Sequence, residues 1–266
     1  MGKSVVISGG TAGMGLATAL ARHERGDRVT VIGSNADKGR ALPGGVRFLR
    51  ADLSQVSEVQ RVAAQITEPV DALGLFANRP SPKRRETADG LEFTFALYYL
   101  SRYLLGHLLG PQLDAAPNPV IVNVAGVGTK AGGINWDDPQ SREKYSVIRA
   151  QLQAGRANDL LGVSFAAQGH RARYVLYHPG FTRSGLDGHE SPVVRGVLRT
   201  LAKFFAKPVA DAVKPIVEWI DHPPTEPLTA IDRGKPVPLS LKTLDPADAR
   251  RLDAYTTGLA GLPRLP

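Results

Sequence analysis

The feature that most constrains this chain is a group of glycines between an apolar strand pattern and a helix pattern. Residues 4–7 are Ser-Val-Val-Ile, residues 8–15 form a glycine-rich turn, and residues 16–25 have the pattern of a helix. Glycines in that place let backbone N–H groups at the positive end of a helix approach a pyrophosphate. The alternative is a turn that serves packing alone. We expect a dinucleotide-binding βαβ unit with contacts from Gly9, Thr11, Gly13, Met14 and Gly15.

Apolar segments alternate with helix-length segments along most of the chain. Strands are expected at residues 28–32, 46–49, 72–76, 120–124 and 173–177, and helices at residues 56–66, 91–109 and 142–167, the last broken by glycines. Apolar strands separated by helices are typical of parallel strands buried on both faces. The expected fold class is therefore α/β, with one doubly wound domain over residues 1–266 and a parallel sheet flanked by helices. The proline-rich segments 221–227 and 235–238 are expected to be loops.

Composition and charge argue against several other classes of protein. The 266 residues include no cysteine, so disulfides, thiolate nucleophiles and Cys-ligated zinc are excluded, and no metal is expected. The net charge is +8, but the basic residues are scattered, which argues against a nucleic-acid partner. No apolar run approaches the ~20 residues of a membrane span, so none is expected. The first residues lack the pattern of a signal peptide, so a cytoplasmic location is expected.

The spacing Gly-x-x-x-Gly-x-Gly from Gly9 to Gly15 resembles that of the short-chain dehydrogenase/reductase family. The resemblance covers nearly the whole chain, and its nearest branch is the retinol-dehydrogenase-like one. Segments 84–92 and 178–183 are similar to family segments on the substrate side, and segments 235–240 and 245–252 resemble the tail of that branch. It implies a Rossmann-type fold in which residues 1–125 mainly bind the dinucleotide and residues 126–266 form the substrate side. A lid is implied at about residues 184–207, where contact of residues 193–207 with an anionic membrane surface is the alternative.

The resemblance also implies cofactor contacts at the ends of later strands. These contacts are Asp52 and Leu53, Ala77 and Asn78, and Pro179, Gly180 and Thr182. An acidic residue at the end of the second strand would bind the ribose 2′-OH of NAD, but that position is Gly33. The sequence therefore favours NADP(H) over NAD(H), with contacts from Ser34, Asn35 and Lys38. For Lys38, a solvated surface charge is the alternative.

The family's catalytic Asn, Ser, Tyr and Lys fall on positions that carry other residues in this chain. The resemblance places Tyr98, Gly126, Gln151 and Gly155 there. A glutamine amide does not donate a proton at neutral pH, so the general acid, worth ~10²–10⁴ in rate, is missing. Tyr145, with Arg149 four residues on, is the alternative proton donor.

These observations leave two function classes open. The first is an atypical reductase-like protein that binds NADP(H) and acts on a small hydrophobic ketone, quinone or polyketide-like molecule, in a redox or a non-redox step. The second is a non-catalytic NADP(H)-binding pseudoenzyme that works as a sensor or scaffold. Since the family often pairs through the helices that hold Tyr98 and Gln151, a homodimer is the alternative to a monomer.

Overall fold

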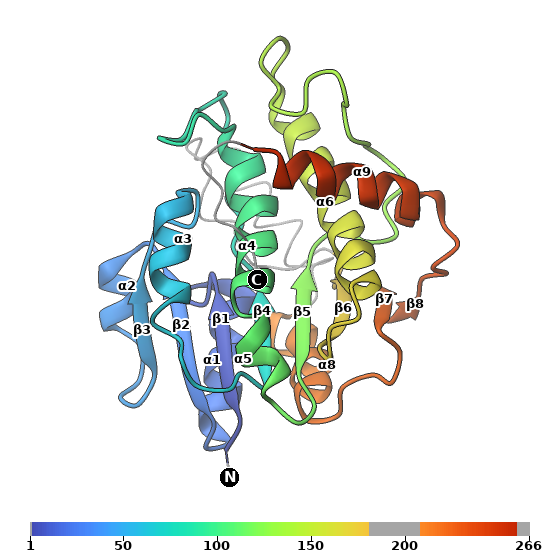
Figure 1. Ribbon diagram of the computed structural model, residues 1–266. Coiled ribbons are helices and arrows are strands. Elements are labelled where there is room, and N and C mark those ends of the chain that lie inside the picture. The colour runs from blue at the N-terminus through green and yellow to red at the C-terminus, as the bar shows by residue number, and fades with distance from the viewer. Residues whose placement is uncertain (1, 181–207, 260–266) are drawn as a thin grey trace.

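The computed structural model of the protein describes residues 2–180 and 208–259 and contains one eight-stranded sheet (Figure 1). Its strand order is β3-β2-β1-β4-β5-β6-β7-β8. The strands are β1 (Ser4–Ser8), β2 (Arg28–Gly33), β3 (Arg47–Arg50), β4 (Ala72–Leu75), β5 (Val120–Val124), β6 (Arg173–His178), β7 (Leu228–Asp232) and β8 (Lys235–Pro236). The first seven strands are parallel, which confirms the expected fold class.

The last strand departs from the expected parallel sheet. β8 pairs antiparallel with β7 through the register Asp232 to Lys235, where a loop was expected. The two residues between them, Arg233 and Gly234, both have positive φ, at 50° and 83°. Two consecutive positive φ values produce a tight hairpin turn whose twist matches that of the strands. The expectation of a loop at residues 235–238 is therefore wrong at Lys235 and Pro236.

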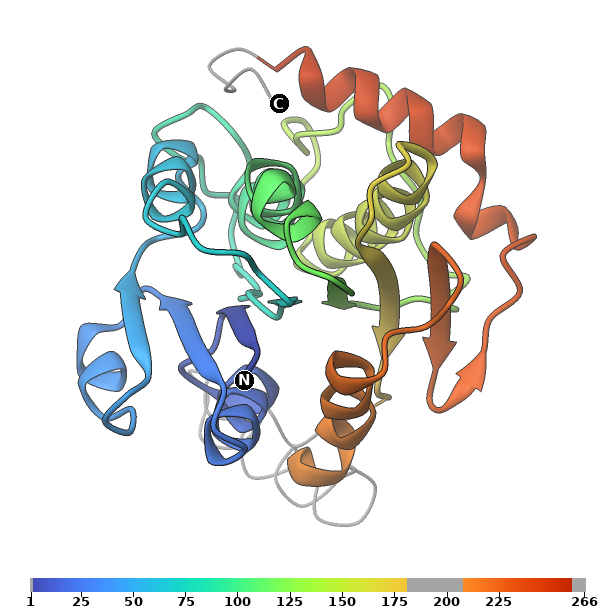
Figure 2. The same ribbon diagram turned by 60° about the horizontal axis from the view of Figure 1, so that its bottom comes forward.

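Helices cover both faces of the sheet (Figure 2). α1 (Gly13–Glu24) packs against α8 (Val209–Asp221) on one face, while α6 (Val147–Ala167), α4 (Ser101–Leu108) and α3 (Val56–Ala63) cover the other. α9 (Pro246–Thr257) lies outside α6. The remaining elements are α2 (Ala36–Arg40), η1 (Phe95–Leu100), α5 (Gly110–Asp114) and η3 (Lys242–Leu244). Among the helices of the described ranges, none has the length and apolar character required to span a bilayer.

The helix expected at residues 142–167 begins later and is not broken by its glycines. The carboxylate of Asp138 accepts hydrogen bonds from the N–H groups of Arg142 and Glu143, at 2.8 and 3.0 Å, and both residues lie in the loop before the helix. The helix therefore begins at Val147. It continues through Gly162, where a Cβ atom would lie 3.0 Å from the side chain of Leu176, so this glycine permits close packing of helix and strand. The lid expected at about residues 184–207 lies outside the described residues.

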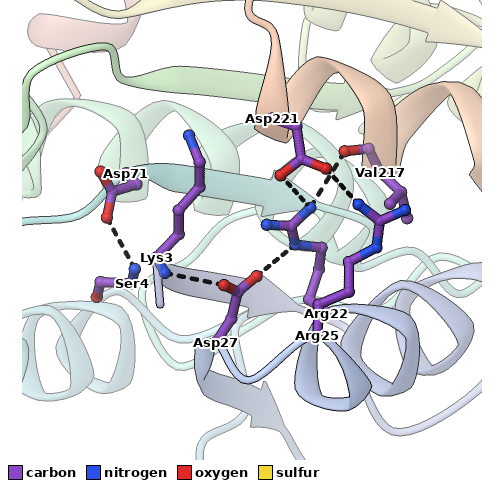
Figure 3. A network of polar contacts seen from close by, with 8 residues as sticks. All are labelled: Lys3, Ser4, Arg22, Arg25, Asp27, Asp71, Val217 and Asp221. Carbon is purple, nitrogen blue, oxygen red and sulfur yellow. Dashed lines mark hydrogen bonds and ion pairs between the residues drawn. The ribbon is translucent and has the colours of Figure 1, made fainter. Parts of the chain in front are cut away.

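A buried ion network ties the start of the sheet to the two helices on one face (Figure 3). Arg22 on α1 is 2% exposed and binds two carboxylates, those of Asp27 before β2 and Asp221 at the end of α8, with the second at 2.7 Å. Asp27 also accepts from the N–H of Lys3, and Asp221 binds Arg25. Because buried charges are costly unless paired, the cation that Asp27 and Asp221 share at Arg22 matters most for Asp27, which has no other cationic partner among the described contacts.

Candidate functional site

A groove of about 770 Å³ runs along the carboxyl ends of the parallel strands. This is the edge at which doubly wound sheets bind their ligands. The groove is lined by every residue expected to contact the cofactor except Thr182, which lies outside the described residues. These residues are Gly9, Thr11, Gly13, Met14, Gly15, Ser34, Asn35, Lys38, Asp52, Leu53, Ala77, Asn78, Pro179 and Gly180. The structure thus brings together segments that are up to 170 residues apart in the chain.

The glycine turn is shaped by close backbone approaches. Gly9 has φ +71°, and a Cβ atom there would lie 2.7 Å from the backbone nitrogen of Ala77. A Cβ atom at Gly15 would lie 2.4 Å from the carbonyl oxygen of Gly9. Ala12 is the N-cap residue of α1 and offers no side-chain hydrogen bond to the first turn, which also has no acidic residue. The first N–H groups of α1 are therefore not satisfied by a cap and lie beside the groove.

The end of β2 has no side chain at the position of Gly33. Gly33 is buried, and a Cβ atom there would lie 2.8 Å from the side chain of Thr11. Asn35 caps α2 by accepting a hydrogen bond from the N–H of Lys38 at 2.9 Å. Beside the end of β2, where the N–H of Ala51 donates to the carbonyl oxygen of Gly33, the carboxylate of Asp52 accepts from the hydroxyl of Ser54 at 2.7 Å. No side chain therefore projects from Gly33 to the place where NAD-specific proteins carry a carboxylate.

A second cavity, of about 210 Å³, is lined by all four positions where the resemblance places the catalytic residues. These are Tyr98, Gly126, Gln151 and Gly155. A Cβ atom at Gly155 would meet no atom within 4 Å, so this position faces open space. Around this cavity the chain therefore presents the amide of Gln151, the ring of Tyr98 and open space at Gly155.

Tyr145, the alternative proton donor, lines neither the groove nor the second cavity. Its hydroxyl donates a hydrogen bond to the carbonyl oxygen of Ser81 at 2.6 Å. It lies in the loop that precedes α6. In this conformation, Tyr145 is engaged in holding loops together.

The side chains of Asn78 and Gln151 are hydrogen-bonded to each other between the groove and the second cavity. Asn78 lines the groove and Gln151 lines the second cavity. Each amide donates to the other, at 3.0 Å from Asn78 and at 3.3 Å from Gln151. The glutamine at the expected tyrosine position is thus held by a hydrogen-bond partner rather than left free.

The expected helix at residues 91–109 contains a π-helical segment, η1, and Tyr98 lies within it. The wider turn leaves the carbonyl oxygen of Tyr98 available, and the amide of Asn158 donates to it at 2.8 Å. Asn123 on β5 donates to Asn158 at 3.1 Å and accepts from Arg102. A buried polar chain therefore supports the floor of the site.

Arg102 is a residue of the groove that the sequence reasoning missed. It is 1% exposed, lies over the ring of Tyr98 at 4.7 Å, and donates to the carbonyl oxygens of Ala77 and Val124. Burial lowers the pKa of its guanidinium to about 10. The sequence feature that could have indicated this residue is that Arg102 is the single charged residue in the apolar run of residues 93–106.

Arg156 and Asp159 on α6 were also missed. Their side chains form an ion pair of 2.8 Å and are 7% and 2% exposed. Arg156 also donates to the carbonyl oxygens of Thr129 and Gly132, in the loop after β5. Burial raises the pKa of Asp159 to about 7, although Arg156 opposes this shift. The sequence feature that could have indicated this ion pair is the i, i+3 spacing of two opposite charges within a helix of mainly apolar residues.

The order of the sheet and the place of the glycine turn define a Rossmann-type α/β protein. The family model described as short chain dehydrogenase matches residues 3–137, just over half of the chain. The chain belongs to the short-chain dehydrogenase/reductase family. Within the described ranges, no group of three metal-ligating side chains is present.

Several relatives support the same assignment. Retinol dehydrogenase 13 of Mus musculus is 28% identical over 203 residues, which cover 71% of this chain and 61% of that protein. Retinol dehydrogenase 12 of Homo sapiens is 29% identical over 204 residues, with coverages of 71% and 65%. The match thus spans about three fifths of the length of these relatives. A Streptomyces sp. (strain C5) protein given the name of a daunorubicin C-13 ketoreductase is 28% identical over 243 residues, with coverages of 86% and 81%.

Two solved structures are similar to this chain. An uncharacterized protein from Mycobacterium paratuberculosis has a TM-score of 0.71 at 26% identity, covering 97% of this chain and 92% of that one. A short chain dehydrogenase/reductase family protein has a TM-score of 0.64 at 20% identity, with coverages of 88% and 97%. The second similarity concerns the fold alone.

Proposed function

We propose that this chain is an atypical short-chain dehydrogenase/reductase that binds NADP(H) in the groove and acts on a small hydrophobic molecule. The main support is that one groove collects every described residue expected to contact the cofactor. The uncapped N–H groups of α1 suit a pyrophosphate, and Lys38 suits a 2′-phosphate next to a position without a carboxylate. Such a cofactor, when bound, supplies or accepts a hydride.

The four substituted positions favour chemistry without the usual Tyr/Lys acid. Two versions fit: hydride transfer with the proton taken from water or from the substrate, or a non-redox step such as isomerisation or elimination. The names of the relatives, a retinol dehydrogenase and a ketoreductase, favour the first version and a ketone or alcohol substrate. A quinone or a polyketide-like substrate stays a prediction. A cytoplasmic location, a homodimer and the division of the chain at residue 125 stay predictions.

The cofactor assignment predicts a thermal shift. NADPH at ~100 times its Kd should stabilise the fold by about 2.7 kcal/mol, which corresponds to roughly 5 °C in Tm for a chain of this size. The shift should be smaller with NADH, and Lys38→Glu should reduce the NADPH shift more than the NADH shift. Lys38 is exposed and has its side chain at the groove, so the variant should fold normally. An absent shift at millimolar NADPH would contradict the assignment.

A second candidate function is a non-catalytic NADP(H) sensor or scaffold. The mutual hydrogen bonds of Asn78 and Gln151 favour it, because they occupy the amide that stands at the expected tyrosine position. Oxidation of NADPH in the presence of a panel of ketones and quinones separates the two candidates. Turnover supports the enzyme, whereas binding of NADPH without turnover, and without conversion of any panel compound, supports the sensor.

A further inference from the structure

Two arginines in the loop after β4 place their guanidinium groups over the same aromatic ring. The guanidinium carbon of Arg79 lies 5.3 Å from the centre of the Phe93 ring, and that of Arg85 lies 4.4 Å from it. The ring belongs to a residue that is 2% exposed, whereas both arginines are exposed. Two cations that share one ring repel each other, and an anion bound next to both relieves this repulsion.

The carboxylates beside these arginines are already engaged. Glu86 and Glu92 form a β-bridge in the same loop. Glu86 pairs with Arg84 at 3.0 Å, and Glu92 accepts hydrogen bonds from two backbone N–H groups, at 2.8 and 2.7 Å. Within the part of the chain that the structure describes, the guanidinium groups of Arg79 and Arg85 have neither an ion pair nor a hydrogen bond. Their N–H donors are therefore available to a ligand.

Hydrogen bonds hold the backbone of the loop that carries the two arginines. The hydroxyl of Tyr145 donates to the carbonyl oxygen of Ser81 at 2.6 Å, and the hydroxyl of Ser81 donates to the carbonyl oxygen of Lys83 at 2.7 Å. The N–H of Phe93 donates to the carbonyl oxygen of Arg85 at 3.0 Å. Because the backbone is held in this way, less conformational entropy is lost when the two side chains bind a ligand.

Arg79 lies at the groove but away from the place expected for the 2′-phosphate of the cofactor. It lines the groove next to Asn78, whose amide donates to Gln151 at the expected tyrosine position. Lys38 follows β2, whereas Arg79 follows β4, and β1 lies between these two strands. Neighbouring strands lie about 4.8 Å apart, so β2 and β4 are about 10 Å apart. The two arginines therefore suit a second ligand of the groove rather than the phosphate expected at Lys38.

We propose that Arg79 and Arg85 bind an anionic oxygen group, a carboxylate or a phosphate, on the small molecule that enters the groove. A guanidinium donates two parallel hydrogen bonds to either group. As an anion site, this stands on the two arginines and their place at the groove. As a statement of substrate class it rests on the proposed function and narrows it to an apolar molecule that carries an anionic group in addition to its reacting group.

The test is a titration of the full chain with benzoate, phenyl phosphate and benzyl alcohol by ligand-observed NMR at low salt. The three compounds share a benzene ring and differ in charge. At least one anion should bind at least tenfold more tightly than benzyl alcohol, and the tighter anion identifies the group. Added salt should weaken its binding, because exposed charges are screened. Equal affinities for all three compounds, or no binding of either anion at millimolar concentration, would overturn the proposal.

Variants separate the two arginines from the general positive charge of the protein. Arg79→Gln and Arg85→Gln should each weaken binding of the tighter anion by about tenfold, the effect of one charge-assisted hydrogen bond. Both positions are exposed, so the variants should fold. Arg250→Gln neutralises an exposed residue of α9 and should retain the affinity. Unchanged affinity in either groove variant would overturn the proposal, as would an equal loss in Arg250→Gln, because the net charge of +8 would then explain the binding.

Repetition at saturating NADPH separates this proposal from the cofactor proposal. The tighter anion should bind with the same affinity in the presence of NADPH, since the phosphates of the cofactor are expected at Lys38 and at the first turn of α1. Competition would mean that Arg79 and Arg85 bind a phosphate of the cofactor, and it would overturn the proposal. A chain that binds the anion but shows no thermal shift with NADPH would retain the anion site and contradict the cofactor assignment alone.

Discussion

Replacement of Ala12 by aspartate is expected to stabilise the fold and to abolish useful NADPH binding. Ala12 is the exposed N-cap residue of α1, with extended backbone angles and no side-chain cap. An aspartate there accepts hydrogen bonds from the first N–H groups and suits the positive helix end, which should add about 1 kcal/mol to the free energy of unfolding. The same carboxylate occupies the N–H groups that the pyrophosphate needs and repels its charge.

The expected loss in NADPH affinity is large because charge-assisted hydrogen bonds contribute about 1.5–3 kcal/mol each. Loss of two such bonds predicts a Kd raised by about 100-fold or more. Ala12→Ser is the matched control, since it caps the helix without a negative charge and should lose less affinity. Calorimetric titration and thermal unfolding measure the two effects. An Ala12→Asp variant that binds NADPH as tightly as the natural chain would show that the cofactor does not use this turn.

Replacement of Arg22 by methionine is expected to destabilise the protein by about 3–5 kcal/mol. The change removes a 2%-exposed cation that Asp27 and Asp221 share, and Asp221 would keep Arg25 as a partner (Figure 3). Asp27 is 8% exposed and would keep only its bond from the N–H of Lys3. Chemical denaturation measures the loss, and the double variant Arg22→Met with Asp27→Asn should recover part of it, since the second change removes the unpaired charge.

Arg40→Met is the control for this loss. Arg40 pairs with Asp37, but both side chains are more than two-thirds exposed. Exposed pairs contribute about 0–1 kcal/mol, so this variant should unfold close to the natural chain. If Arg22→Met were as stable as Arg40→Met, the network at the start of the sheet would not hold α1 and α8 together.

The parts of the fold that were predictable have strong local signals. β5 occupies the predicted residues 120–124 because a short apolar run lies between loops, and the glycine turn lies where four glycines of residues 9–15 follow a strand. The start of α6 was not predictable in this way. Asp138 accepts hydrogen bonds from the backbone of residues 142 and 143, which lie in the loop before the helix, and contacts of this kind are not visible in a periodicity.

The assembly of the groove could be predicted from the ends of the strands, whereas contacts between side chains of different elements could not. The groove residues follow from the ends of parallel strands, so their assembly needs only the strand order. Arg102 and the pair Arg156–Asp159 depend on which way a helical side chain points, and on burial that no local pattern records. The space at Gly155 likewise exists only because its neighbours do not fill it.

We propose that a dinucleotide groove persists in a protein whose positions for the family's proton donor carry other residues. A crystal structure with NADPH tests this claim most directly. We expect the pyrophosphate on the N–H groups of residues 13–15, and no phenol hydroxyl or lysine ammonium within hydrogen-bond reach of the substrate face of the nicotinamide. An empty groove at saturating NADPH, or Tyr145 and a lysine beside the nicotinamide, would contradict the account.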